Sequence, residues 1–283
     1  MNGRDDAGRF LRSRRDRITP HDAGVTFHGQ RRVPGLRRGE VAELAGISVE
    51  YYTRLERGDL RGVSSDVLAA IARALRLDPV EQQYLRDLSR GVNEPVGSRR
   101  AEPEAVPLPW SLRRIIESMP GLPAFVNNHR LDTLAANKLG RALYAPMWDD
   151  PASGLNAARW GFLHPAARDF YLDWESITGF AAGALRAEAA KRPDDKILAD
   201  LIDDLSTRSE DFRTAWAAHT VNLFRDDKRL RHPAVGVIDL RMEVLEVPDD
   251  SGLSVVVYTP IPGTGAEESL KQLSAWWSDE ESS

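Results

Sequence analysis

The sequence contains no cysteine. This absence excludes disulfide bonds, metal sites with thiolate ligands and a cysteine nucleophile. No apolar run approaches the roughly 18 residues that a membrane-spanning helix needs, and the charged first residues lack the apolar stretch of a signal peptide. These absences favour a cytoplasmic protein without a membrane partner.

The common motifs of enzymes and metal sites are also missing. The chain has no H-E-x-x-H, no G-x-S-x-G and no phosphate-binding loop. The candidates for metal ligands are His219, Asp226, Asp227 and His232, but their spacing is not that of a metal site. We therefore predict a protein that is not an enzyme and has no metal or other cofactor.

The composition is that of an ordinary globular protein, with 42% hydrophobic and 29% charged residues. A length of 283 residues suggests two domains. Residues 1–100 hold 19 Lys and Arg against 14 Asp and Glu, whereas residues 101–283 hold 19 against 29. This uneven distribution suggests that a module for binding a polyanion is joined to a module with another role. Solvated charged surfaces are the alternative explanation.

The boundary between the two domains is predicted within residues 91–108. This segment contains Pro95, Pro103 and Pro107 and no apolar periodicity. Proline removes a backbone donor and disfavours helix in the residue before it, so we expect an extended linker. Residues 1–90 then form the first domain, and residues 109–278 form the second.

Residues 1–90 have the pattern of about five helices. Ser48 is suited to cap the third helix, and Ser64 or Ser65 the fourth. Before the fifth helix, Asp78 and Glu81 have the spacing of a capping box. The first domain is therefore predicted to be all-α.

Residues 109–278 combine strands and helices. The segment 123–137 has the pattern of a β-hairpin with its bend at Asn127, Asn128 and His129, and 238–244 and 253–261 have the pattern of strands. An amphipathic helix is expected from Trp110 to Met119. Further helices are expected near 138–144, 168–190, 195–206 and 209–219. This order predicts an α+β domain with an antiparallel sheet.

Residues 39–58, GEVAELAGISVEYYTRLERG, have the spacing of a helix-turn-helix motif. Ala42 is small where two helices approach, and Gly46 tolerates the positive φ that the turn needs. Ile47 can fill the core beneath the turn, and Ser48 begins the next helix. In this motif the second helix lies in the major groove of DNA. Spacing alone leaves open an all-α interaction module without DNA contact.

The candidates for base contacts are the exposed positions of the second helix of this motif. Glutamate can accept a hydrogen bond from cytosine, valine can contact a thymine methyl group, and arginine can bind guanine. On helical geometry the exposed positions are Val49, Glu50, Thr53, Arg54 and Arg57.

Phosphate contacts are expected mainly from residues next to these positions. Arg37, Arg38, Tyr51 and Arg57 are the candidates, and Ser48 belongs to the same DNA-binding set. A carboxylate beside DNA is unfavourable. We therefore expect Glu56 to turn inward and pair with Arg15 or Arg14.

These motifs carry a resemblance to known families. The fragment RRVPGLRRGEVAELAGISVEYYTRLERG resembles the N-terminal domain of Xre-type, phage-repressor-like regulators. Residues 120–275, with PAFVNNHRLDTLAAN and FLHPAARDFYLDWE, resemble the MmyB-like (MltR-type) ligand-binding domain. The resemblance implies a PAS-like fold, in which a sheet and helices surround a small-molecule cavity, and a role in sensing a ligand and altering DNA binding.

The second domain contains the aromatic residues that such a cavity needs. All seven tryptophans lie after residue 109. Apolar walls with a few polar groups suit a small-molecule pocket, although aromatic residues at helical spacing are more often plain core and a histidine more often makes a structural hydrogen bond. The candidates for ligand binding are Phe125, Trp160, Phe162, Trp174, Phe180, Trp216, His219 and Tyr258.

Together these features predict a sequence-specific transcriptional regulator. It would bind a double-stranded DNA operator, and its C-terminal domain would sense a small, largely apolar effector. One helix-turn-helix motif reads about half a site, so we expect a homodimer on a roughly palindromic operator. One alternative is a protein that binds or modifies a small molecule and in which DNA binding is secondary; another is an interaction scaffold.

Overall fold

The computed structural model describes residues 3–25, 33, 35–93, 108–219, 227–248 and 251–280. Contacts along the chain divide it into two compact units. Unit 1 comprises Met1–Glu102, Arg186–Ala199 and Ala217–Asn222, and unit 2 comprises Pro103–Leu185, Asp200–Trp216 and Leu223–Ser283. Most of the predicted linker, 91–108, lies outside the described residues.

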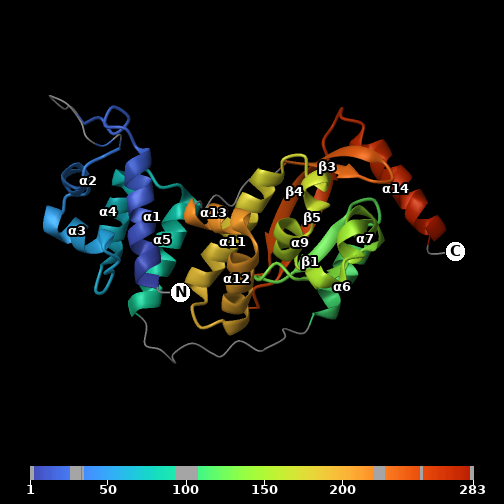
Figure 1. Ribbon diagram of the computed structural model, residues 1–283, viewed down its shortest axis with the longest axis horizontal. Coiled ribbons are helices and arrows are strands. Elements are labelled where there is room, and N and C mark those ends of the chain that lie inside the picture. Colours follow the sequence, from blue (N-terminus) through green and yellow to red (C-terminus); the bar gives the residue numbers. More distant parts are fainter. Residues whose placement is uncertain are drawn as a thin grey trace. The chain divides into compact units, whose positions relative to one another are not determined.

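Unit 1 contains the predicted helices (Figure 1). The predicted caps are present: the Oγ atoms of Ser48 and Ser64 accept hydrogen bonds from the backbone N–H groups three residues later. Asp78 and Glu81 exchange the two hydrogen bonds of a capping box. The five helices are α1 (Gly3–Arg17), α2 (Arg38–Ala45), α3 (Val49–Glu56), α4 (Ser65–Ala74) and α5 (Pro79–Asn93).

The hydrophobic core of unit 1 lies among these five helices. Phe10, Tyr52, Leu55 and Ile71 are fully buried. The rings of Phe10 and Tyr84 meet edge to face, with their centroids 5.0 Å apart. Burial of such a side chain contributes roughly 1.5–3 kcal/mol, so the apolar faces of the helices supply most of the stabilisation.

A buried carboxylate connects three of the helices. Glu56 on α3 has a side chain only 1% exposed and pairs with Arg15 of α1, Nε to Oε1 2.6 Å, and with Arg38 of α2. The prediction that Glu56 turns inward is confirmed with Arg15 as a partner, whereas Arg14 pairs with Glu81 at 2.7 Å. Burial alone would raise the pKa of Glu56, but the hydrogen bonds from Arg15 and Arg38 hold it below its ordinary value of 4.5.

Two later segments of the chain complete unit 1. Arg186, in α11 (Trp174–Lys191), is buried and lies 3.4 Å from Asp6, measured from Nη1 to Oδ1. Its neighbour Ala187 belongs to the core of the five helices. The carbonyl oxygen of His219 accepts a hydrogen bond of 2.7 Å from Nη2 of Arg14. Unit 1 is therefore discontinuous in sequence.

Unit 2 is built on a five-stranded antiparallel sheet. Strands β1 and β2 pair across the predicted hairpin, and their register shifts between Val126 and Asn127, where the bend begins. This confirms the predicted α+β fold. In the order β2-β1-β5-β4-β3, the strands are β1 (Ala124–Asn127), β2 (Thr133–Ala136), β3 (Asp227–His232), β4 (Gly236–Glu246) and β5 (Ser254–Pro260).

Helices cover both faces of this sheet. Ile116 of α6 packs with Val126 and Val257 on one face, and Leu139 of α7 and Leu270 of α14 pack with Phe125 on the other. The helices after the linker are α6 (Trp110–Glu117), α7 (Lys138–Leu143), α8 (Ala145–Trp148), α9 (Ala157–Leu163), α10 (Ala167–Phe170), α11, α12 (Lys196–Arg208), α13 (Glu210–Ala217) and α14 (Ala266–Glu280), with a 3-10 turn at Pro151–Ser153.

The structure corrects the prediction of one long helix near 168–190. The chain leaves helical geometry after Phe170, because Tyr171 bridges to Leu230 of β3 and the backbone N–H of Leu172 donates to the carbonyl of Arg229 at 3.0 Å. Strand β3 and helices α8, α9 and α14 were not predicted either. The prediction missed the break in the helix and strand β3 for the same reason, because each of these features is stabilised by its contact with the other.

The interior of unit 2 contains an unusual polar group. Alternation along β3 turns Lys228, Leu230 and His232 inward. Nζ of Lys228 donates to Oη of Tyr258 at 3.2 Å, and this oxygen lies 3.0 Å from Oη of Tyr144. No carboxylate pairs with Lys228 in the part of the chain that the structure describes, and burial lowers its pKa to about 8.

Replacing Glu56 by glutamine should lower the free energy of unfolding by about 3 kcal/mol at neutral pH, because Arg15 and Arg38 lose their compensating charge. The folded-state pKa of Glu56 is depressed, so its stabilisation is complete above 4.5 and is lost as the pH falls through that lower pKa. Urea unfolding should therefore show a smaller difference between wild type and Glu56→Gln in acid than at neutral pH. Asp5→Asn, in an exposed pair with Arg9, should cost less than about 0.5 kcal/mol; an equal cost would contradict the prediction.

Replacing Lys228 by methionine should stabilise the protein at neutral pH, because it removes an amine without a carboxylate partner from the interior. The folded-state pKa is lowered to about 8, so the unfolded chain binds the proton more tightly, and wild-type stability rises with pH from about 8 towards 10.5. The advantage of Lys228→Met in urea unfolding should shrink over that interval. Lys271→Met, at an exposed side chain, serves as the control. A variant less stable than wild type at neutral pH would show that the lysine stabilises the fold.

Candidate nucleic-acid interface and ligand pocket

Helices α2 and α3 meet in the geometry of a helix-turn-helix motif. Gly46 has a φ of 66°, and Ala42 is fully buried where the helices approach. The N–H of Ile47 donates to the carbonyl of Ala42 at 3.0 Å and closes α2. Oγ of Ser48 accepts the N–H of Tyr51 at 3.1 Å and begins α3. Each of these residues has the local structural role that the spacing predicts.

The first turn of α3 faces solvent. Val49 is 44% exposed, Glu50 and Arg57 are also exposed, and Thr53 and Arg54 are half-buried. Tyr52 and Leu55, on the opposite side of the helix, are fully buried. The helix is therefore anchored by one side while the other carries the predicted base contacts.

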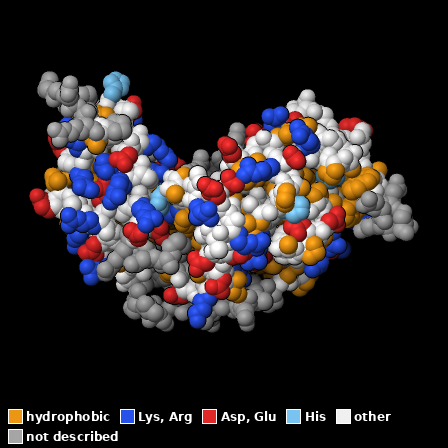
Figure 2. Space-filling view, in the orientation of Figure 1, with side chains coloured by type: hydrophobic (Ala, Val, Ile, Leu, Met, Phe, Trp, Pro, Cys, Tyr) orange, Lys and Arg blue, Asp and Glu red, His pale blue; other side chains and the backbone are white. Residues whose placement is uncertain are grey.

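The predicted phosphate contacts lie at both ends of α3 and at the start of α2. Arg37 and Ser48 are exposed. The backbone N–H of Arg37 donates to Oε2 of Glu40 at 2.7 Å, at the start of α2. Arg38 is engaged with Glu56, but 48% of its side chain remains exposed. Basic side chains are visible on the face of unit 1 drawn in Figure 2.

Arg54 makes contacts that the sequence analysis did not predict. Its Cζ atom lies 4.6 Å from the centroid of the half-buried Tyr51 ring. Its Nη2 atom donates to the carbonyl oxygen of Arg61 at 3.5 Å. Arg61 is itself paired with Asp59, Nε to Oδ1 2.7 Å. Spacing along α3 could have indicated the contact with Tyr51, but not that with the following turn.

Three of the predicted ligand-binding residues meet in the interior of unit 2. Phe125, Trp160 and Tyr258 are buried in one cluster. Phe125 and Tyr258 meet edge to face at 5.8 Å between ring centroids. The indole nitrogen of Trp160 is buried and has no hydrogen-bond partner among the described residues. Phe180 packs against this cluster from α11.

A second aromatic group involves the other candidates. Phe162 lies 6.4 Å from Trp174 and 5.0 Å from Phe212, measured between ring centroids. Phe212 stacks on Trp216 at 5.4 Å. The indole N–H of Trp174 donates to the carbonyl of Gly161 at 2.9 Å. These rings form continuous packing between α9, α11 and α13.

His219 lies apart from these aromatic groups, and His232 makes a structural hydrogen bond. His219 is buried in unit 1, where burial and then the charges of Arg186, Arg9 and Arg14 lower its pKa to about 4. Nε2 of His232 lies 3.0 Å from the carbonyl oxygen of Ala142, and burial lowers its pKa. Within the described ranges no three His, Asp or Glu side chains are arranged to hold a metal, and Asp226 lies outside those ranges.

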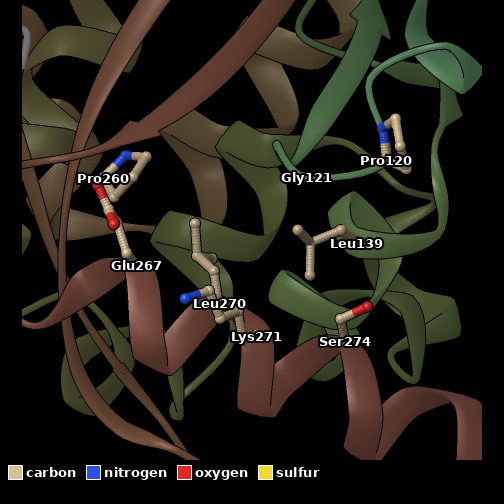
Figure 3. Close-up of a pocket in the computed structure, with 8 residues that line it drawn as sticks. All are labelled: Pro120, Gly121, Leu139, Pro260, Glu267, Leu270, Lys271 and Ser274. Carbon is tan, nitrogen blue, oxygen red and sulfur yellow. The ribbon is translucent and has the colours of Figure 1, made fainter.

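Unit 2 contains a pocket of about 370 Å³ that the sequence analysis missed (Figure 3). Leu139 of α7 faces the side chains of α14 across it, and Leu139 and Leu270 belong to the same buried cluster as Phe125 and Trp160. Its walls come from separate segments, so no local pattern could have revealed it. The lining residues are Pro120, Gly121, Leu139, Pro260, Glu267, Leu270, Lys271 and Ser274.

No helix in the ranges that the structure covers is long and apolar enough to cross a membrane. A helix-turn-helix domain model matches residues 6–85, which include most of α1, all of α2 to α4 and the first half of α5. A model of the MmyB-like transcription regulator ligand binding domain matches residues 108–273, more than half of the chain. No curated protein matches the chain.

The two matches agree with the fold and with the resemblance of the motifs. Both are families of transcription regulators and neither is a family of enzymes. The helix-turn-helix domain implies DNA binding, and the second domain implies a small-molecule effector. The chain belongs to the MmyB-like transcription regulators, with an N-terminal helix-turn-helix DNA-binding domain and a C-terminal ligand-binding domain.

Proposed function

We propose that this regulator reads a specific double-stranded DNA operator with the first turn of α3, and that a small, largely apolar molecule bound in unit 2 changes its operator affinity. One observation carries the DNA-binding part. The capped first turn of α3 exposes Val49 and Glu50, while Glu56, the acid at the other end of the helix, is buried in ion pairs. The side of α3 that faces solvent therefore offers base contacts, and the negative charge of Glu56 is kept away from it.

Each candidate side chain of α3 for a base contact has a chemical partner in the major groove. Val49 suits a thymine methyl group, Glu50 a cytosine amino group and Arg54 the O6 and N7 atoms of guanine, while Thr53 can donate or accept. The residues that suit the phosphate backbone are Arg37, Arg38, Ser48, Tyr51 and Arg57. The phosphate contacts fix the register, and the base contacts select the sequence.

The assembly that fits this readout is a homodimer. One recognition helix reads about half an operator, and two copies related by a two-fold axis would read a palindromic site. A regulator of transcription acts where the DNA is, which is the basis for proposing a location inside the cell.

The pocket in Figure 3 is the proposed binding site for the effector. Its volume of about 370 Å³ falls within the roughly 300–1,000 Å³ of small-molecule sites. Pro120, Leu139 and Leu270 supply apolar walls, whereas Glu267 and Lys271 supply polar groups. Since Leu139 and Leu270 share a cluster with Phe125, Trp160 and Tyr258, a ligand here would alter the packing of these predicted residues. Trp174 and Phe180 pack on that cluster, and Phe162 and Trp216 continue the packing from Trp174 through Phe212. His219 lies in unit 1, outside this pocket.

Selection from random duplexes by the full-length protein should enrich one operator sequence. Glu50→Ala and Arg54→Ala should each relax the preference at a base position by roughly five- to 150-fold, the effect of losing a good base contact. Arg57→Ala should weaken binding to all sequences alike and reduce its salt dependence, because a phosphate contact carries no sequence information. Arg86→Ala, at an exposed position of α5, is the control. If the wild type enriches no sequence, the proposed readout is wrong.

Filling the pocket should prevent effector binding. Gly121 has open space where a side chain would begin, so Gly121→Leu should occupy the pocket without strain. Gly179 in α11 also has open space and does not line the pocket, which makes Gly179→Leu the matched control. Mass spectrometry of small molecules that co-purify should find the same compound in wild type and Gly179→Leu, and little of it in Gly121→Leu. Full retention in Gly121→Leu would place the effector elsewhere.

A further inference from the structure

The contact between Tyr51 and Arg54 joins two residues to which the proposed readout gives different tasks. Arg54 is a candidate for a base contact, and Tyr51 for a phosphate contact. Cζ of Arg54 lies 4.6 Å from the centroid of the Tyr51 ring, within the range of a favourable cation–π contact. Residues three apart on a helix are neighbours on one face, so this contact is built into α3 itself.

This contact gives the Arg54 side chain a direction. Side chains of a helix lean towards its N-terminus, and Tyr51 lies in the first turn of α3. The Arg54 guanidinium, whose Nη2 atom also contacts the carbonyl of Arg61 beyond the end of α3, therefore lies over the ring of a residue in the first turn. This is the part of the helix that enters the major groove.

The guanidinium is held in place while its hydrogen-bonding capacity is little used. Within the described residues the Arg54 side chain makes one hydrogen bond, a long one of 3.5 Å from Nη2 to the carbonyl of Arg61. The negative charge of Asp59 also acts on it. A bidentate contact with guanine needs two N–H donors in a fixed plane. Nε of Arg54 is buried without a partner among the described residues, so a contact of this kind would use the two Nη atoms, which the Tyr51 ring holds from one side.

We propose that Tyr51 is a positioning residue for operator specificity, whose ring orients the Arg54 guanidinium for a bidentate contact with one guanine of the operator. The inference rests on the proposed function of α3 as the reading helix. An arginine without this support would have to be immobilised when DNA binds, at a cost in conformational entropy. The ring restricts the side chain before binding.

A role of the Tyr51 hydroxyl on a phosphate would have a different consequence. Loss of a phosphate contact weakens binding to every sequence by the same factor, because phosphates carry no sequence information. Loss of the ring contact would instead lower the preference for guanine at one position. The ratio of two affinities therefore separates the two roles.

The experiment uses the full-length protein and two duplexes. One carries the operator that the wild type selects, and the other has the guanine replaced at the position whose preference depends on Arg54. Tyr51→Leu should reduce the affinity ratio of the two duplexes at least about fivefold, towards the ratio of Arg54→Ala. Tyr51→Phe keeps the ring and loses the hydroxyl; it should keep the ratio within about twofold of wild type while both affinities fall together.

Two further variants cover a failure of Tyr51→Leu to fold, which a thermal melt would detect. Arg54→Lys keeps the charge but has no planar group for the ring to orient, so it should lose the guanine preference as Arg54→Ala does. Adding Tyr51→Phe to Arg54→Lys should lower both affinities without changing their ratio. A ratio that falls in Tyr51→Phe as far as in Arg54→Ala would overturn the proposal, as would a folded Tyr51→Leu with the wild-type ratio.

The outcomes also distinguish this inference from the proposed function. If the wild type selects no sequence, the readout by α3 fails as a whole. If a sequence is selected and Arg54 determines one base, but Tyr51→Leu keeps the wild-type ratio, only the positioning role of Tyr51 fails. If Arg54→Ala leaves every base preference intact, the positioning role fails while readout by Val49 and Glu50 stands.

Discussion

The arrangement of α3, the proposed reading helix, depends on the burial of one carboxylate, that of Glu56. Arg15 reaches it from α1 and Arg38 from α2, so a single charge on α3 connects the three helices that form the motif and its support. Charge-assisted hydrogen bonds of this kind are directional and strong when shielded from water. They hold α3 in orientation, and they neutralise an acid that would otherwise repel a polyanion. The same pairing leaves 48% of the Arg38 side chain exposed at the start of α2.

Local features of the fold were predictable because their causes are local. Ser48 and Asp78 act within a few residues, and a cap or a glycine turn needs no distant partner. Glu56 was predictable for a different reason: a carboxylate beside DNA is unfavourable unless it accepts a hydrogen bond from a base, as proposed for Glu50. The α+β class followed from the order of strand and helix patterns, which distant contacts reinforce without changing.

The features that escaped prediction depend on residues far apart in sequence. The helix is interrupted at Tyr171 because this residue bridges to Leu230 of β3, 59 positions later in the sequence. Neither segment has a strong pattern of its own. The pocket needs the turn at Gly121, helix α7 and helix α14 together. Arg186 and His219 belong to unit 1 although they lie within the sequence of the ligand-binding domain. Sequence position assigned His219 to the wrong neighbours, because only tertiary packing brings it to Arg14.

Both units leave some buried polar atoms without a hydrogen-bond partner among the described residues, such as Oη of Tyr52 in unit 1, but they differ in how their buried charges are compensated. In unit 1, the Glu56 carboxylate has two arginine partners and the α3 cap is complete, which favours a fixed orientation of the proposed reading helix. In unit 2, Lys228 has a phenol and no described carboxylate, and the Trp160 indole nitrogen has no described partner. Such groups make the interior less stable than a fully paired one. A domain that must respond to a ligand needs alternative packings close in free energy, and an incompletely satisfied interior brings them closer, whereas a base-reading surface loses specificity whenever it moves.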